Sequence, residues 1–354
     1  MTSSNSPGTG AGRSSSAARH SGQVSRRPSR FLLGIAAVYG VAALVVLVSW
    51  SLFGDAWWLQ PLNLTMIWWP LPAFALALVA IGMRQWRALA WLLVPILGWT
   101  WIYATAWVPP TNVDVAAPAD LRVVAWNMFV GTPDASHVTE MVDRVDPDVV
   151  LLMEVFPARQ EELETELEDR LPYTAAVQSE GVGGVMVASR YPIADVREVP
   201  SVEGARSSLV AIVDVDGTHL QVVPVHLRSP CLECGDSLTQ RLSLEGSTRA
   251  AEMAAVLGAL EPGMPTIVGG DLNSNERSLP YRELTGAGFD DAQRSVGQGP
   301  GFTWPAGGGR MPFPMVRIDW LLSRGLEPVA AWVEPAGPSD HHPVVATFTF
   351  QEAS

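Results

Sequence analysis

Three stretches without a charged side chain lie within the first 108 residues, and they restrict what this part of the chain can fold into. Residues 31–53 form an uncharged run of 23 residues. As a helix that rises about 1.5 Å per residue, this run would reach roughly 35 Å, enough to cross a hydrocarbon core of about 30 Å. Residues 56–83 and 88–108 are uncharged as well. The sequence therefore predicts three transmembrane helices within residues 31–108.

Arginine side chains indicate how these helices are oriented. Five Arg residues precede residue 31, and Arg84 and Arg87 lie between the second and third stretches. Basic segments stay on the cytoplasmic side, so three crossings leave the rest of the chain outside. We expect a multi-pass protein of the cell membrane with an extracytoplasmic domain, and a disordered cytoplasmic tail at residues 1–30. A cleaved signal peptide is the alternative, but two further apolar stretches follow the first.

The part of the chain that follows residue 108 is strongly acidic. Residues 1–108 hold seven Arg and one acid, giving +6, whereas residues 109–354 hold 16 Arg and 35 acids, giving −19. Affinity for nucleic acid comes largely from basic groups, so this balance argues against a nucleic-acid partner. Residues 109–119 are rich in Pro and Ala and are expected to form a stiff linker, followed by one domain at residues 120–354.

Short apolar runs alternate with amphipathic stretches through residues 120–354. Mixed strands and helices in this order predict an α/β fold in which two packed sheets are covered by helices. Helices are expected at 138–145, 158–171, 240–260 and 279–284. Strands are expected at 121–126, 149–153, 185–188, 195–199, 208–215, 220–226, 266–268, 316–322, 329–333 and 344–350.

Polar side chains stand directly beside the ends of many of these strands, where loops gather reactive groups on a rigid support. Glu154, Asp271 and Asp340 offer the oxygen ligands that suit Mg²⁺ or Mn²⁺. His226 and His341 can transfer protons near neutral pH. The combination predicts metal-dependent hydrolysis of a phosphate ester. The complete set is Asn127, Glu154, His226, Asp271, Asn273, Asp319, Asp340 and His341.

The ordered blocks WN, ME, ASRYPI, VHL, GDLN, FTW, RIDW and SDHHP resemble the endonuclease/exonuclease/phosphatase superfamily over about residues 120–350. This superfamily of metal-dependent phosphohydrolases includes deoxyribonuclease I, abasic-site endonucleases and sphingomyelinases. The resemblance implies a four-layer α/β sandwich of two mixed β-sheets flanked by helices, preceded here by three transmembrane helices. With its anchor, the chain is also similar to the membrane-anchored VanJ-like branch, for which phospholipid or isoprenoid phosphates are the expected substrates.

The resemblance also implies which residues bind metal and substrate. Glu154 resembles the principal metal ligand, with Asn127 beside it, and Asp340 resembles a further acid of the metal site. Asn127, Ser189 and Asn273 are the expected substrate contacts, with Ser189 taken from the ASRYPI block.

Five residues are expected to carry out the reaction. Asp271 and Asn273 resemble the pair that positions the attacking water and the phosphate. His341 resembles a base-like histidine oriented by Asp319. His226 resembles the residue that stabilises or protonates the leaving oxygen.

Five more residues have open interpretations. Glu180 is the candidate by position to orient His226, as a Glu does in deoxyribonuclease-like members. Thr303 and Trp304 either line the cleft or close a loop. Arg317 either faces a substrate phosphate or forms a structural salt bridge, which we favour. His342 is expected at the surface, because alternate residues of an extended segment point in opposite directions.

Cys231 and Cys234 form a C-x-x-C pair. Outside the cytoplasm a local disulfide is the favoured interpretation, and a redox dithiol is the alternative. A zinc site would need a second pair of ligands of this kind, and the sequence has no other Cys.

We therefore expect a membrane-anchored extracytoplasmic phosphohydrolase that cleaves phosphoester or pyrophosphate bonds of a lipid-linked or small envelope substrate. An extracytoplasmic nuclease is the first alternative, and a non-catalytic receptor or resistance scaffold is the second. The full set of polar residues argues against a scaffold. The sequence implies no obligate protein partner.

Overall fold

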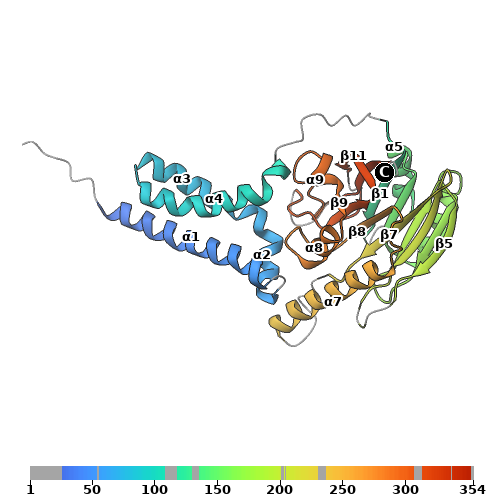
Figure 1. Cartoon of the computed structure of the whole chain (residues 1–354), viewed down its shortest axis with the longest axis horizontal. Helices are drawn as coiled ribbons and strands as arrows, with labels where there is room; N and C mark the ends of the chain where they lie inside the picture. The colour runs from blue at the N-terminus through green and yellow to red at the C-terminus, as the bar shows by residue number, and fades with distance from the viewer. Residues whose placement is uncertain are drawn as a thin grey trace, which may run out of the picture.

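The computed structural model of the protein describes residues 26–53, 56–107, 118–129, 135–200, 203, 205–229, 237–306, 313–335 and 337–351. An N-terminal helix bundle is followed by a domain of two β-sheets with covering helices, as Figure 1 shows. Of the tail predicted at residues 1–30, residues 26–30 belong to the first helix, which begins earlier than expected. The rest of the tail, and most of the linker predicted at 109–119, lie outside the described residues.

The bundle consists of three longer helices and a short irregular segment between the first two. Its elements are α1 (Arg26–Phe53), η1 (Trp57–Leu59), α2 (Gln60–Thr65), η2 (Met66–Trp68), α3 (Pro70–Gly82) and α4 (Trp86–Trp107). Small side chains let these helices approach closely: Ala36, Ala77 and Ala88, one from each longer helix, are buried together. A Cβ on Gly40 would lie 2.6 Å from the carbonyl oxygen of Trp91. Such close backbone approach at small residues is typical of helices packed within a membrane.

Of the three transmembrane helices predicted, two have the length and apolarity to cross a membrane, namely Arg30–Phe53 with 24 residues and Trp86–Ala104 with 19. The middle stretch is not one long helix. Its apolar helical part, Met66–Gly82, is shorter, and about 1.5 Å per residue gives it a reach of roughly 26 Å against a hydrocarbon core of about 30 Å. Pro61 is the second residue of α2 and Pro70 is the first residue of α3, in agreement with the rule that proline fits the first turn but breaks a helix interior.

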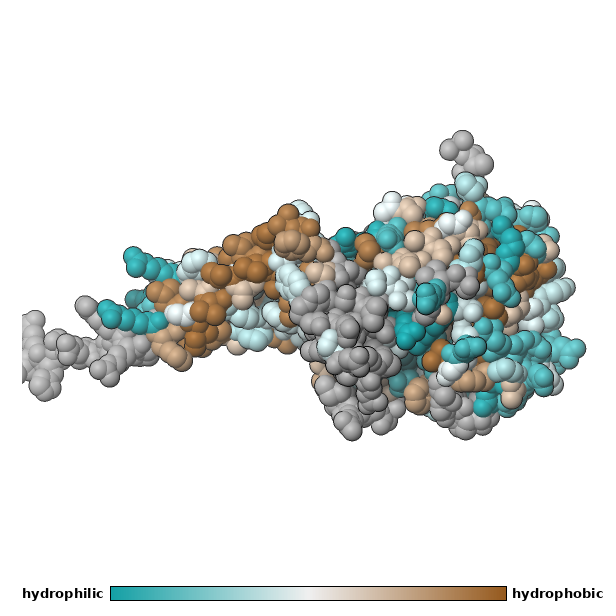
Figure 2. Space-filling view, turned by 90° about the horizontal axis from the view of Figure 1, so that it is seen from below, coloured by the Kyte–Doolittle hydropathy of each residue, from teal (hydrophilic) through white to brown (hydrophobic). Residues whose placement is uncertain are grey.

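The bundle and the sheet domain differ in the surface they present. Large apolar side chains such as Val38, Leu78 and Trp101 are exposed on the bundle. Figure 2 shows hydrophobic residues gathered over the bundle, whereas hydrophilic residues are interspersed with hydrophobic ones over the sheet domain. Exposed apolar surface of this extent on helices needs an apolar surrounding or a partner to cover it.

The domain contains two six-stranded sheets. Sheet A has the order β11 (Leu326–Val333), β12 (Val344–Phe350), β1 (Leu121–Asn127), β2 (Val149–Val155), β4 (Gly184–Ser189) and β3 (Tyr173–Val177). Sheet B has the order β5 (Ile193–Glu198), β6 (Leu209–Val215), β7 (Thr218–His226), β8 (Thr266–Asp271), β10 (Asp319–Arg324) and β9 (Asp290–Asp291). The pairs β1–β2 and β7–β8 are parallel and the other paired strands are antiparallel, so both sheets are mixed.

Three apolar cores separate four layers. Leu151 from sheet A and Ile267 from sheet B belong to the core between the sheets. Leu152 packs on the opposite face with Leu163, because successive strand residues point to opposite faces. The helices outside sheet A are α5 (Ser136–Val145) and α6 (Pro157–Leu167), and those outside sheet B are α7 (Leu238–Ala259) and α8 (Leu279–Gly286). This confirms the predicted α/β sandwich of two mixed sheets flanked by helices.

The expected strands and helices of the domain are present with shifted ends, and three short elements are additional. These are β3, β9 and the five-residue helix α9 (Ala292–Val296). Strand β3 lies at a sheet edge and its residues are at most half-buried. It therefore lacks the apolar run by which buried strands are recognised in a sequence.

Candidate active site

Three of the expected residues form one row across sheet B. His226, the last residue of β7, pairs with Asp271, the last residue of β8. Asp271 in turn pairs with Asp319, the first residue of β10. Paired residues of neighbouring strands point to the same face, and strands lie about 4.8 Å apart. His226 and Asp319 therefore stand on opposite sides of Asp271.

Sheet A supplies Asn127 at the end of β1 and Glu154 at a β-bulge in β2. The register of β2 against β4 shifts between Met153 and Val155, and Glu154 has a φ of 65°. Val155 packs under the helices together with Leu152, although unbroken alternation would turn Val155 to the inner face. The extra residue is Glu154, and a bulge of this kind changes the direction of a side chain at a sheet edge.

A glycine pair makes room for this bulge. Gly183 has a φ of 73°, and a Cβ there would lie 2.8 Å from the carbonyl carbon of Glu154. A Cβ on Gly184 would lie 1.9 Å from the carbonyl oxygen of Val177. The segment around Glu180 thus supports the bulge through its backbone, whereas Glu180 itself is exposed.

Asn127 joins the two sheets. Its Nδ2 donates hydrogen bonds to Glu154 Oε1 at 3.2 Å and to Asp271 Oδ2 at 3.1 Å. Its Oδ1 accepts a hydrogen bond from the backbone N–H of Phe129 at 3.0 Å. The expected metal ligand Glu154 and the expected catalytic Asp271 therefore share one amide donor.

Asp319 and His341 form a buried pair. The Nδ1 of His341 lies 2.9 Å and 3.1 Å from the two carboxylate oxygens of Asp319, and its Nε2 lies 3.9 Å from Asp271 Oδ2. The backbone N–H of His341 donates to Ser339 Oγ, which donates to the carbonyl of Asn127. These bonds fix the loop before β12 against the end of β1. They bring together Asn127 and His341, the first and last residues of the expected set in the sequence.

Asn273 holds Asp271 in place. Its backbone N–H donates to Asp271 Oδ1 at 2.8 Å, and its Nδ2 donates to Asp271 Oδ2 at 3.0 Å and to the carbonyl of Leu227 at 2.9 Å. Asn273 has a φ of 47°, a left-handed conformation that Asn tolerates better than most residues. Its amide is engaged with protein groups in this arrangement.

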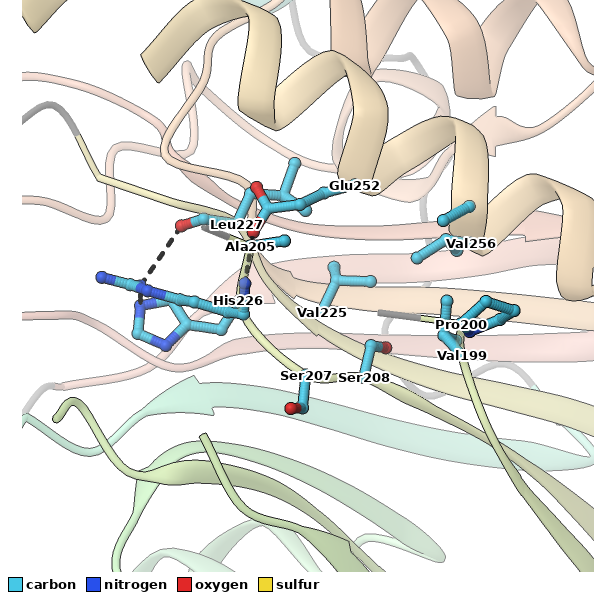
Figure 3. Close-up of a pocket in the computed structure, with 12 residues that line it drawn as sticks. Val199, Pro200, Ala205, Ser207, Ser208, Val225, His226, Leu227, Glu252 and Val256 are labelled. Carbon is cyan, nitrogen blue, oxygen red and sulfur yellow. Dashed lines mark hydrogen bonds between the residues drawn. The ribbon is translucent and has the colours of Figure 1, made fainter. Parts of the chain in front are cut away.

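His226 contacts a guanidinium that sequence reasoning missed. Its Nε2 lies 3.6 Å from Glu154 Oε1 and 3.6 Å from Asp271 Oδ2, and the Nη1 of Arg206 contacts the same Nε2. His226 lines a pocket together with Arg206, Leu227 and Glu252, and Figure 3 shows this pocket. Arg206 belongs to a loop between β5 and β6, without an apolar run directly before it to mark it as a site residue.

The charges in the site give its two histidines different protonation. Burial and the charge of Asp319 raise the pKa of Asp271 to about 7. Burial by itself would lower the pKa of His341, but the charges of Asp319 and Asp271 raise it to about 10. Burial and the charge of Arg206 lower the pKa of His226 well below its usual value. In the metal-free protein these shifts favour an imidazolium at His341 and a neutral ring at His226 near neutral pH.

The donor atoms fit a divalent cation. Asp340 Oδ1 is buried and has no hydrogen-bond partner in the described part of the chain, and it lies 4.0 Å from His341 Nε2. Its second oxygen, Oδ2, accepts a hydrogen bond from Trp304 Nε1 at 3.3 Å. A buried carboxylate oxygen without a donor is costly unless a cation or a water molecule satisfies it.

Two groups of residues could hold such a cation. Asn127 is hydrogen-bonded to Glu154, and the third expected ligand, Asp340, lies beside His341. The ligand atoms of Asp271, Asp319 and His341 also lie within 4.8 Å of one another. In this second group, the imidazolium of His341 already pairs with the carboxylate of Asp319.

The structure does not bring Ser189, an expected substrate contact, together with the other candidate residues. Ser189 pairs with Val149 at the start of β2, whereas Glu154 lies at the other end of that strand. Strand β4 runs antiparallel to β2, so its final residue lies at the opposite end of the sheet from Glu154. The Ser189 hydroxyl accepts a hydrogen bond from the backbone N–H of Tyr191 at 3.0 Å, which is a strand-end role.

The residues with open interpretations have mainly structural contacts. Thr303 Oγ1 accepts hydrogen bonds from the backbone N–H groups of Ile318 and Asp319, at 3.2 Å and 3.3 Å. Arg317 forms a buried ion pair with Asp291, as favoured. His342 is half-buried rather than at the surface, and its Nδ1 lies 2.8 Å from the carbonyl oxygen of Glu334.

Two further expectations concern the loops around the site. Among the described residues, Glu180 forms no hydrogen bond or ion pair with His226, and Arg206 is found beside that histidine instead. Cys231 and Cys234 lie outside the described residues.

Solved structures share this fold. An endonuclease/exonuclease/phosphatase from Beutenbergia cavernae DSM 12333 is 23% identical, with 67% of this chain and 73% of that chain covered and a TM-score of 0.53. A functionally unknown conserved protein from Enterococcus faecalis V583 is 18% identical, with 65% and 100% covered and a TM-score of 0.52. At these identities the likeness concerns the fold alone. No curated protein sequence matches the chain.

The sequence itself also matches a family model. The match to the Endonuclease/Exonuclease/phosphatase family covers residues 124–341, more than half of the chain, and runs from β1 to His341. It therefore spans every residue that the fold gathers at this end of the sandwich. The chain belongs to the endonuclease/exonuclease/phosphatase family and is a metal-dependent hydrolase that acts on phosphate ester bonds.

Proposed function

We propose that this protein is a membrane-anchored phosphohydrolase that cleaves phosphoester or pyrophosphate bonds of a lipid-linked or small envelope substrate outside the cytoplasm. The observation that carries the proposal is the contact between the helix bundle and the loops of the site. Asn275, two residues after Asn273, donates a hydrogen bond from Nδ2 to the carbonyl of Asn63 in α2. The bundle therefore touches the loop that holds Asp271.

A second contact joins the bundle to the loop that contains Thr303 and Trp304. Trp68 Nε1 donates to the carbonyl of Met315 at 2.7 Å, and the ring centroids of Trp68 and Phe302 lie 5.3 Å apart. Both contacts come from the same end of the bundle. If the bundle is in a bilayer, the site is next to the headgroups, where the phosphate of a lipid-linked substrate lies.

The direction of the helices supports three crossings. Arg30, at the start of α1, and Arg84 and Arg87, around the α3–α4 turn, belong to the end of the bundle that lies away from the sheet domain (Figure 1). Basic residues favour the cytoplasmic side, so the opposite end and the domain would lie outside. We propose that the membrane part begins with α1 at Arg26 and extends to residue 108, followed by a linker at 109–119 and a hydrolase domain at 120–354.

The residues of the site suit hydrolysis of a phosphate ester. We propose that Glu154, Asn127 and Asp340 hold Mg²⁺ or Mn²⁺, which when bound neutralises charge on the phosphate oxygens and polarises the phosphorus centre. Asp271, fixed by Asn273, would orient the attacking water.

The two histidines would serve opposite sides of the phosphorus. His341 would receive the proton of the attacking water in its neutral form, which the charge of a bound divalent cation would favour over the imidazolium of the metal-free protein. Asp319 on Nδ1 would orient the ring and stabilise the imidazolium that forms. His226 stands across Asp271, on the side where an in-line reaction expels its leaving group.

The test is phosphate release by the full-length protein in nanodiscs with Mg²⁺. Substrates would be polyprenyl phosphates and diphosphates, phospholipids, a soluble aryl phosphate diester and plasmid DNA. We expect turnover of at least one membrane-embedded substrate, abolished by Glu154→Gln. Turnover of DNA alone would favour the nuclease alternative, to which the −19 charge of residues 109–354 is unfavourable. Absence of Glu154-dependent turnover on the whole panel would refute the proposal.

A further inference from the structure

We infer that Arg206 binds the oxygen that leaves the phosphorus, and that His226 serves as the hydrogen-bond acceptor that holds Arg206 rather than as a proton donor. The inference rests on the phosphate-ester hydrolysis described above and assigns one step of it to a residue outside the expected set. It applies to any leaving group, whether an alcohol, a phenol or a phosphate.

Arg206 is held by four protein groups. Its Nη1 contacts His226 Nε2 and donates to the carbonyl of Leu227 at 3.2 Å. Its Nη2 donates to Ser229 Oγ at 3.1 Å, and its backbone N–H donates to Glu252 Oε1 at 2.7 Å. The guanidinium therefore has a defined position at the end of β7 instead of extending into solvent.

The contact with His226 has only one possible direction. A guanidinium carries five N–H donors and no acceptor, and it stays protonated in proteins. The Nε2 of His226 must therefore accept, which leaves the ring proton on Nδ1. A nitrogen that accepts from Arg206 has no proton of its own to give to a leaving oxygen.

The fold places Arg206 on the leaving-group side. His226 and Asp319 flank Asp271 in one row across sheet B. An in-line displacement needs the attacking and leaving oxygens on opposite sides of the phosphorus. With the Asp319–His341 pair on the side of the attacking water, His226 and Arg206 stand on the other.

Arg206 also has the charge and the free donors for this task. Its charge interacts with those of Asp271 and Glu154, so the guanidinium lies within electrostatic range of the site. Three of its five N–H groups donate to His226, Leu227 and Ser229, and the other two have no partner among the described residues. Arg206 is half-buried, so these donors remain within reach of a ligand.

The chemical step balances without a protein acid. The water oxygen forms a new bond to phosphorus while the P–O bond to the leaving group breaks and leaves its electron pair on that oxygen. The water proton passes to Nε2 of His341 in its neutral form, and Asp319 stabilises the imidazolium that results. The leaving oxygen departs as an anion beside the guanidinium of Arg206 and takes its proton from solvent.

The experiment compares leaving groups in the full-length protein. Aryl phosphate diesters whose phenols range from p-nitrophenol to phenol would be assayed with wild type, Arg206→Gln and Arg206→Lys. A cation beside the leaving oxygen matters most when that oxygen keeps a high charge. We expect Arg206→Gln to lower kcat/KM by less than about 10-fold for p-nitrophenyl esters and by about 100-fold for phenyl esters, with Arg206→Lys in between.

Two controls separate this role from a structural one. Arg170→Gln removes an exposed guanidinium that pairs with Asp143 and should leave all rates unchanged. His226→Gln keeps an acceptor for Arg206 and should lower all rates by a similar, small factor.

The outcomes are distinct. An equal loss for every leaving group in Arg206→Gln would overturn the inference and leave a positioning role. A leaving-group effect that appears in His226→Gln and not in Arg206→Gln would restore His226 as the proton donor. If the wild type shows no Glu154-dependent turnover of any ester, the proposed function fails and the inference fails with it.

Discussion

Replacement of Asp319 by Asn tests the site most directly, because it removes one charge and leaves the shape of the side chain. Asp319 is fully buried, and both of its oxygens lie within 3.1 Å of His341 Nδ1. The backbone N–H of Asp319 is bound by Thr303 Oγ1, a contact that Asn keeps. The start of β10 should therefore stay in place while the pair with His341 is lost.

The expected size of the effect follows from the pKa of His341, which is about 10 in the folded protein against about 6.5 unperturbed. At about 1.4 kcal/mol for each tenfold change, this difference is on the order of 4–5 kcal/mol, shared between Asp319, Asp271 and Asp340. We expect Asp319→Asn to lower the free energy of unfolding by roughly 2–3 kcal/mol at pH 7. Loss of an oriented base lowers rates by about 10²–10⁴-fold.

The assay is the initial rate of p-nitrophenol release from an aryl phosphate diester with saturating Mg²⁺. Thermal unfolding in detergent separates loss of activity from loss of fold. We expect kcat to fall by at least about 100-fold in protein that still unfolds cooperatively. A folded variant with kcat within about threefold of wild type would refute the assignment of Asp319 and His341 as one unit.

Three further predictions concern other parts of the molecule. Glu154→Gln should weaken Mg²⁺ binding by at least about tenfold in calorimetry, and a larger loss in Asp319→Asn would instead favour the group of Asp271, Asp319 and His341. Because the pKa of His341 is raised, its ion pair stabilises the metal-free protein fully below about pH 6.5, and this stabilisation is lost as the pH rises through about 10. In the presence of a chelator, the difference in unfolding midpoint between wild type and Asp319→Asn should therefore shrink over that pH range. A difference that grows with pH would contradict this sign. Ser189→Ala should leave kcat/KM unchanged, and a fall of tenfold or more would place Ser189 at the substrate after all.

Most of the site could be predicted because its residues stand next to strong local signals. Asn127, His226 and Asp271 end apolar runs that form buried strands, and a polar residue at such a point is visible in the sequence. Asp319 and His341 stand at or just before the start of antiparallel strands, which brings them to the same end of the sandwich. The resemblance to the family indicated which role each of these residues was expected to have.

Ser189 shows where this reasoning stops. It also follows an apolar strand within a family block, but β4 runs antiparallel to β2. The end of a strand at which a residue lies is local information, whereas the direction of that strand in the sheet depends on its neighbours. The exposed Glu180 fails for a similar reason, since closeness in sequence order does not imply a contact.

The apolar and charged patterns of the sequence by themselves determined the apolar helices before residue 108, the alternation of strands and helices, and the identity of the carboxylates and imidazoles, because these depend on side-chain type and short-range periodicity. Only the tertiary structure decided that the bulge places Glu154 beside Asn127 and His226, that the middle apolar stretch is broken and packs mainly against α4, and that Arg206 contacts His226. Each of these features results from contacts between segments that are far apart in the chain. The free energy of such contacts cannot be estimated from a local sequence pattern.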